Sequence, residues 1–180
     1  MLLAFDTSSA ACTAALFDGD GACIARRDEL IGRGHAERLV PMIAELLDGR
    51  RAARVLVGVG PGSFTGIRVA IAAAHGLAIG WDAELKGMSS LALLAVGADG
   101  QSEVAAAVIG GHGELFVQQF DAKTSEPISG LRNLAPAEAA RFRGSAAACV
   151  AAPACRAAWS RRRPCPRRAP CRALRGTRAR

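Results

Sequence analysis

Residues 57–80 read VGVGPGSFTGIRVAIAAAHGLAIG and predict a strand, a tight turn and a long helix in direct succession. The apolar run at 55–59 is typical of a buried strand. The Gly-Pro-Gly turn at 60–62 ends that strand and leads into the helix. The helix is lined with alanine and glycine, so it has little bulk with which to fill a core. This succession of elements indicates an α/β layer.

The glycine-rich turn before the helix raises the question of a nucleotide site. Ser63 or Thr65 is a natural N-cap, and free N–H groups there could hold an anion. A phosphate-binding P-loop requires GxxxxGK[ST], whereas three residues separate Gly62 from Gly66 here, and Ile-Arg follows. A Walker-type site is therefore rejected. Arg68 could contact a phosphate or form a surface salt bridge, and the salt bridge is the preferred interpretation.

Small residues recur at every fourth position of the helix, with Gly76 and Gly80 nearby. They are Gly66, Ala70, Ala74 and Ala78. A row of small side chains forms a shallow groove in which another helix can approach closely. Packing against the chain's own sheet explains the row equally well, and exposure of the row would favour a partner. His75 on the same helix is expected to pack rather than to bind a ligand.

Further strands and helices are predicted on both sides of this segment. The expected strands are 2–5, 12–17, 23–27, 84–86, 104–109 and 114–120, and the expected helices are 35–47, 89–96 and 136–141. Three meander strands, followed by alternating helices and strands, are typical of a ribonuclease H-like α/β layer. The predicted fold therefore has a ribonuclease H-like N-terminal lobe at 1–98 and an incomplete second lobe of the same kind at 103–142.

Charge divides the chain into two parts. Residues 1–138 hold 11 Lys and Arg against 16 Asp and Glu, a net of −5, whereas residues 139–180 hold 12 Arg and no acidic residue. From residue 143 the chain is almost entirely Ala, Arg, Pro and Cys without periodicity, so 143–180 is expected to be a disordered tail. GC-rich DNA read in a wrong frame yields this composition, which is our preferred interpretation. An arginine-rich arm that binds RNA is the alternative.

The cysteines and the N-terminus favour a cytoplasmic protein with reduced thiols. Cys12 and Cys23 lie in the acidic part, and the four tail cysteines contain no CxxC pair, so a zinc site is not expected. The N-terminus has no basic region before its short apolar run, which argues against an export signal. No apolar run approaches the ~20 residues needed to span a bilayer, so no membrane association is expected.

Asp6, Thr7 and Ser8 follow the first strand, where a carboxylate and hydroxyls could face a phosphate or its metal. The alternative is that Asp6 and Ser8 satisfy backbone donors of the turn. The three histidines are far apart in the sequence, and none has a second metal ligand at i+3 or i+4. The sequence also shows no recognisable Ser/His/Asp catalytic triad. No metal site and no catalytic residue are therefore predicted.

Three stretches together resemble one protein family. LLAFDTSS at 2–9, GHAERLVPMIAELL at 34–47 and the segment at 57–80 resemble TsaB (also called YeaZ), a family of bacterial tRNA threonylcarbamoyladenosine biosynthesis proteins. GPGSFTGIR after an apolar strand is the most specific of these features, and the resemblance extends from residue 1 to about residue 142. It implies the two-lobed actin-like ATPase fold, in which each lobe is ribonuclease H-like.

The resemblance implies a scaffold subunit rather than an enzyme. The family pairs with the catalytic subunit TsaD, which transfers a threonylcarbamoyl group to N6 of an adenosine in tRNA, and the ATPase TsaE joins the assembly. TsaD carries an HxxxH metal motif where this chain has GMSSL at 87–91. The resemblance thus implies that tRNA is met only through the complex and that no cofactor is required. If ATP or ADP binds, we expect it at the interface with the partner. Asp6, Thr7 and Ser8 are the residues expected to lie near a nucleotide.

The family pairs through helices of its N-terminal lobe, which assigns the small-residue groove to the partner. The expected interface residues are Ser63, Phe64, Thr65, Gly66, Ile67, Arg68, Ala70, Ala74 and Ala78. A homodimer beside the heterodimer stays open. The rival interpretation is a small ATP-dependent phosphotransferase of the actin-like ATPase superfamily that uses Asp6 and the glycine-rich turn.

Overall fold

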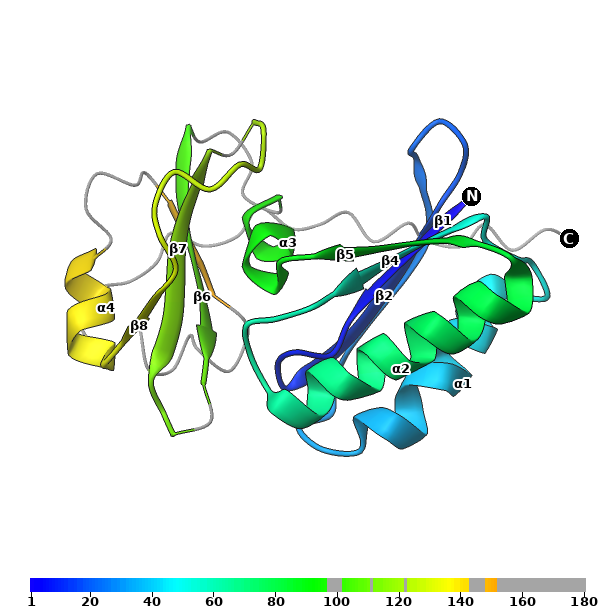
Figure 1. Ribbon diagram of the computed structural model, residues 1–180, viewed down its shortest axis with the longest axis horizontal. Helices are drawn as coiled ribbons and strands as arrows, with labels where there is room; N and C mark the ends of the chain where they lie inside the picture. The colour runs from blue at the N-terminus through cyan, green and yellow to red at the C-terminus, as the bar shows by residue number, and fades with distance from the viewer. Residues whose placement is uncertain (97–101, 111, 122, 143–147, 152–180) are drawn as a thin grey trace, which may run out of the picture.

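The computed structural model describes residues 1–96, 102–110, 112–121, 123–142 and 148–151. Its elements form two groups, each around its own sheet (Figure 1). The first unit comprises β1 (Leu2–Asp6), β2 (Ala11–Phe17), β3 (Cys23–Leu30), α1 (His35–Leu47), β4 (Arg54–Gly58), α2 (Phe64–Trp81) and β5 (Glu84–Met88). The second unit comprises α3 (Ser90–Val96), β6 (Glu103–Ile109), β7 (Leu115–Asp121), β8 (Arg132–Leu134), α4 (Pro136–Phe142) and β9 (Ala148–Ala151).

The sheet of the first unit has the strand order β3-β2-β1-β4-β5. β1 lies antiparallel to β2, with Leu3 opposite Leu16, and parallel to β4, with Leu3 opposite Val55. The predicted meander and the strand that precedes the Gly-Pro-Gly turn are confirmed. Because β1 and β4 run parallel, their carboxyl ends meet at one edge of the sheet. The turns after these two strands therefore lie next to each other.

α1 and α2 lie side by side on one face of this sheet (Figure 1). The predicted apolar row of α1 is confirmed, because Leu39, Ile43, Leu46 and Leu47 are all buried. They pack with Leu3, Phe5, Cys12, Ala14, Leu16, Val55 and Val57 of the strands. Full burial of one leucine side chain contributes about 2 kcal/mol, so this shared core holds α1 on the sheet.

The second unit has a separate sheet, in the order β8-β7-β6-β9, and a separate core. β6 and β7 form the predicted antiparallel hairpin. α3 packs into this second core through Leu91, Ala92 and Ala95. The unit expected at 1–98 therefore ends with a helix whose apolar side chains lie with Val104 and Phe120. Chain order alone groups α3 with the elements that precede it.

Residues Ala148–Ala151 correct one expectation. They form β9, which pairs parallel to β6 with Cys149 opposite Ala105, although the composition predicts no packed structure after residue 143. A strand requires only backbone hydrogen bonds along an open sheet edge, which composition does not reveal. The rest of the expected tail, 143–147 and 152–180, lies outside the described residues.

α2 corrects another expectation, because it is an apolar run close to membrane-spanning length. Its 18 residues include Arg68 as the single charged residue, and by length and composition the helix could cross a bilayer. One such helix is weak support for a membrane protein. In this fold α2 lies against β4, β5 and α1, so packing within the first unit accounts for part of its apolar character.

Candidate functional site

The turn after β1 docks onto the start of α2. The Ser63 N–H donates to the Ser8 carbonyl oxygen at 2.6 Å, and the Thr7 hydroxyl donates to the Gly66 carbonyl oxygen at 2.6 Å. The Ser63 hydroxyl in turn accepts from the Gly66 N–H at 3.3 Å, which confirms Ser63 as the N-cap. The DTSS turn at 6–9 and the GPGSFTG stretch at 60–66 therefore form one hydrogen-bonded cluster.

Glycines allow this docking because backbone approaches backbone. A Cβ at Gly62 would lie 2.2 Å from the Ser8 carbonyl oxygen, and a Cβ at Gly66 would lie 1.8 Å from the Thr7 carbonyl oxygen. No side chain fits at either distance. The glycines of the GPGSFTG stretch thus make room for the chain's own turn, and two N–H groups at the start of α2 are already bonded within the chain.

The Asp6 carboxylate is hydrogen bonded through both oxygens. Its Oδ1 accepts from the Ser8 N–H and from the Ser8 hydroxyl, each at 2.7 Å, and its Oδ2 accepts from the Ser90 hydroxyl at 2.5 Å. A Cβ at Gly58 would lie 1.7 Å from Oδ2, so the carboxylate lies directly against the β4 backbone. Sequence reasoning overlooked Ser90 and Gly58. The only signals were a serine pair at the start of α3 and a glycine at the end of β4.

These contacts match the alternative interpretation of residues 6–8, in which the side chains satisfy donors of the fold. Thr7 is 0% and Ser8 is 2% exposed. The N–H and the hydroxyl of Ser8 both donate to Asp6 Oδ1. Three of the roughly four acceptor sites of the Asp6 carboxylate are thus occupied by the Ser8 N–H, the Ser8 hydroxyl and the Ser90 hydroxyl. Nucleotide proximity of Asp6, Thr7 and Ser8 stays a prediction.

The small-residue row of α2 faces the sheet rather than a partner. Gly66, Ala70 and Ala74 are buried against the first unit, and Ala78 is half-buried. The expectation that this row forms an open docking groove is therefore wrong for its first three members. Their small size serves another purpose, because it lets the helix backbone lie close to β1 and β4.

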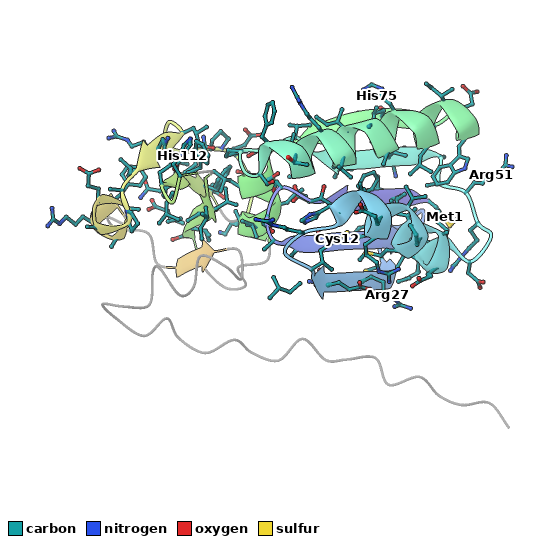
Figure 2. All side chains as sticks on the ribbon, turned by 90° about the horizontal axis from the view of Figure 1, so that it is seen from below. Met1, Cys12, Arg27, Arg51, His75 and His112 are labelled. Atoms are coloured by element: carbon teal, nitrogen blue, oxygen red, sulfur yellow. The ribbon has the colours of Figure 1, made fainter. Side chains whose placement is uncertain are left out.

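The opposite side of α2 is the exposed one, and we call it the outer face. It consists of Phe64, Thr65, Arg68, Ala72, His75, Gly76, Ile79 and Gly80. Figure 2 shows His75 on this side, away from the sheet, so the expectation that it packs is wrong. Ile79 is 82% exposed, and a Cβ at Gly76 or Gly80 would meet nothing within 4 Å.

The surface salt bridge preferred for Arg68 is not formed within the described residues, and a contact of Arg68 with phosphate stays a prediction. Its guanidinium lies over the Phe64 ring, 3.8 Å from the centroid, and within the described part of the chain it forms no ion pair. Phe64 is itself 68% exposed. A cation–π pair of this kind leaves both side chains at the surface, with the guanidinium hydrogens free to bind an additional group.

One charged cluster and one buried thiol lie on the same side of the sheet as α1. Arg38 binds the Glu29 carboxylate through two nitrogens, at 2.6 and 2.7 Å, and binds Glu45 at 2.8 Å. Hydrogen bonding to this guanidinium lowers the pKa of both glutamates. Burial, with a smaller contribution from the Glu29 charge, raises the pKa of the Cys12 thiol to about 11. These groups stabilise the fold and form no chemical site.

His75 and His112 lie apart in space as well as in sequence (Figure 2). His35 is buried at the start of α1, and its Nε2 has no hydrogen-bond partner among the residues that the structure describes. His75 lies on the outer face of α2, and the backbone N–H of His112 donates to Glu114 in the second unit. Among the described residues, no three His, Cys, Asp or Glu side chains are grouped closely enough to hold a metal ion.

Comparison with known proteins gives consistent matches. The family model of TsaD, tRNA N6-adenosine threonylcarbamoyltransferase, matches residues 28–148. The tRNA threonylcarbamoyladenosine biosynthesis protein TsaB of Escherichia coli (strain K12) is 36% identical over 127 residues, which cover 66% of this chain and 54% of that protein. TsaB of Haemophilus influenzae is 41% identical over 100 residues, 52% of this chain and 41% of that protein.

Among solved structures, YeaZ from Pseudomonas aeruginosa superposes with a TM-score of 0.68 at 35% identity, and the match covers 75% of this chain and 67% of that one. A second P. aeruginosa structure, described as similar to peptidase YeaZ, gives the same TM-score at 36% identity. The predicted ribonuclease H-like, actin-like fold class is thereby confirmed. The chain spans about half the length of the curated relatives it matches.

Proposed function

This chain belongs to the TsaB (YeaZ) family, and from that premise we propose that it is a non-catalytic subunit of the machinery that makes threonylcarbamoyladenosine in tRNA. Its partner is a TsaD-type catalytic subunit, and a TsaE-type ATPase joins the assembly. The chain meets tRNA only through this complex, in the cytoplasm. It needs no cofactor of its own, and ATP or ADP binds only where the partners meet.

The single observation that carries the pairing proposal is the outer face of α2. This face holds one charged residue, Arg68, and a strongly exposed Ile79. Glycine in an exposed helix interior costs about 1 kcal/mol relative to alanine, and nothing in the described fold requires the missing Cβ of Gly76 or Gly80. A second helix that approaches the backbone closely would require it.

The exposed row of small residues proposed as the interface is therefore shifted by two positions in the sequence from the row that was predicted. Ala72, Gly76 and Gly80 take the place of Ala70, Ala74 and Ala78 as the open small-residue row. Arg68 is at its N-terminal end, and its guanidinium is available to a carboxylate of the partner. The occupant of this face is a helix of the TsaD-type subunit. A second copy of this chain is the competing occupant and an outcome of the test.

Two features of the chain support a non-catalytic role, the sequence at 87–91 and the contacts of the Asp6 carboxylate. Residues 87–91, where the catalytic subunit has its HxxxH motif, read GMSSL. The rival phosphotransferase needs Asp6 to face a nucleotide, whereas its two oxygens accept hydrogen bonds from Ser8 and Ser90. These contacts favour the scaffold over the phosphotransferase.

Reconstitution tests the function. The full chain, a TsaD-type subunit, a TsaE-type ATPase, tRNA and threonylcarbamoyl adenylate are combined, and modified adenosine is measured by mass spectrometry. We expect formation of the product to depend on this chain, and the chain alone to form none. Product at an unchanged rate without the chain contradicts the scaffold. Metal-dependent ATP turnover by the chain alone that disappears in Asp6→Ala favours the rival.

A further inference from the structure

Among the described residues, the main connection between the two units lies where β5 leads into α3. Elements of the first unit pack mainly against one another, and those of the second unit do the same. Within the described residues the chain passes between the units once, from β5 to α3, and the Met88 side chain of β5 packs against the second core. The orientation of α3, and of the core that it helps to form, therefore depends on the contacts around this crossing (Figure 1).

Ser90, the first residue of α3, concentrates these contacts. Its N–H donates to the Gly60 carbonyl oxygen at 2.9 Å, and its hydroxyl accepts from the Gly60 N–H at 3.1 Å. The same hydroxyl donates to Asp6 Oδ2 at 2.5 Å. Ser90 is 3% exposed, and the next residue, Leu91, is part of the second core. One side chain thus ties the second unit to two strand ends of the first.

We propose that Asp6, Gly60 and Ser90 form a joint that fixes the second unit on the first, and that Asp6 is a positioning residue within it. This role goes beyond the pairing function and does not depend on it. Gly58 supports the proposal independently, because its missing Cβ leaves the space that the Asp6 carboxylate needs to reach Ser90. The carboxylate after β1 thereby acts on the orientation of the two units rather than on a ligand.

Residual dipolar couplings of the full chain test the joint, because they report the orientation of each unit separately. In the unsubstituted chain we expect the backbone couplings of both units to fit one alignment tensor. In Ser90→Ala we expect the tensors of the two units to differ, and the Gly60 amide to exchange about tenfold faster. Ser89→Ala is the matched control, because the one hydrogen bond of the Ser89 hydroxyl in the described part of the chain is accepted from the Ala92 N–H of α3 itself.

Separate tensors in Ser90→Ala, with couplings inside each unit unchanged, support the joint. A single shared tensor and an unchanged Gly60 exchange rate would overturn it, and so would equal loosening in Ser89→Ala. General destabilisation raises exchange throughout both units without separating the tensors, and that result also counts against the joint. If Ser90→Ala does not fold, Asp6→Ala, which removes the carboxylate that accepts from the Ser90 hydroxyl, is measured with the same outcomes.

Discussion

The α-carbon of Gly66 faces the carbonyl oxygen of Thr7 so closely that a Cβ would lie 1.8 Å from that oxygen. The Thr7 hydroxyl donates to the Gly66 carbonyl oxygen, so the turn after β1 and the first turn of α2 hold each other. This contact explains why a glycine-rich loop precedes a helix without any lysine. The loop accommodates a neighbouring backbone, and the direction in which α2 leaves the sheet follows from that contact.

Gly66→Ala is expected to destabilise the fold by about 3 kcal/mol or more, because the atoms that a new Cβ would meet are backbone and cannot rotate away. Urea unfolding followed by circular dichroism measures the loss. Gly76→Ala in the same helix is the matched control and is expected to stabilise by about 1 kcal/mol, since its added Cβ meets open space. Equal effects of the two substitutions would show that the approach of Thr7 to Gly66 is not tight.

Cys12 is expected to resist alkylation at pH 8. Only the thiolate reacts, and burial raises the pKa of this thiol to about 11. Its thiolate fraction in the folded chain is then roughly 100-fold below that in the unfolded chain. Peptide mass spectrometry after timed iodoacetamide treatment measures the rate, with the exposed Cys23 as internal control. Equal rates for the two cysteines would contradict the burial of Cys12.

The same shift sets the sign of a pH dependence. Because the folded state binds the Cys12 proton more tightly than the unfolded state does, its stabilising contribution is complete below the unfolded pKa, about 8.5. It is lost as the pH rises towards about 11. We expect the difference in stability between the unsubstituted chain and Cys12→Ala to shrink over this range. A constant difference would show that deprotonation of Cys12 does not contribute to the pH dependence of stability.

Arg38→Met is expected to lower stability at pH 6 and to have less effect as the pH falls below 5. Bonding to Arg38 lowers the folded-state pKa of Glu29 and of Glu45. Their contribution is therefore present above the unfolded pKa, about 4.3, and is lost as the pH falls through the lower folded value. Urea midpoints at several pH values measure this trend.

Lys86→Met is the control for Arg38→Met. Its partner pair, Lys86 with Glu84, is more exposed, with side-chain exposures of 70% and 50%, and exposed pairs contribute little. We expect no resolvable pH-dependent loss in that variant. A loss of stability as large as that of Arg38→Met would mean that the two-nitrogen contact of Arg38 with Glu29 stabilises the fold no more than the exposed Lys86–Glu84 pair does.

Periodicity predicts the elements whose apolar residues have one clear side. In α1, the row from Leu39 to Leu47 faces the sheet as its spacing predicts. α2 has no such contrast, because its sheet-facing row of Gly66, Ala70 and Ala74 and its outer row of Ala72 and Gly76 are both small. Spacing therefore locates the helix but cannot decide which row is buried.

The contacts that build the candidate site lie beyond any local pattern. Thr7 and Gly66 are 59 positions apart, and Asp6 and Ser90 are 84 positions apart. Both pairs form because the parallel strands β1, β4 and β5 place their carboxyl ends at one edge of the sheet. The sequence predicts those strands, but it does not say which hydroxyl reaches the Asp6 carboxylate, since Ser90 stands in a helix of the second unit.

The binding affinity between this chain and a TsaD-type catalytic subunit, measured for a substitution on the outer face of α2, tests the central claim most directly. Ala72→Glu introduces a charge beside Gly76 and is expected to weaken binding by at least about tenfold. Ala137→Glu, the same change at an exposed position of α4, is expected to leave the dissociation constant within about twofold. Equal binding of Ala72→Glu and Ala137→Glu would contradict the assignment of this face to the partner.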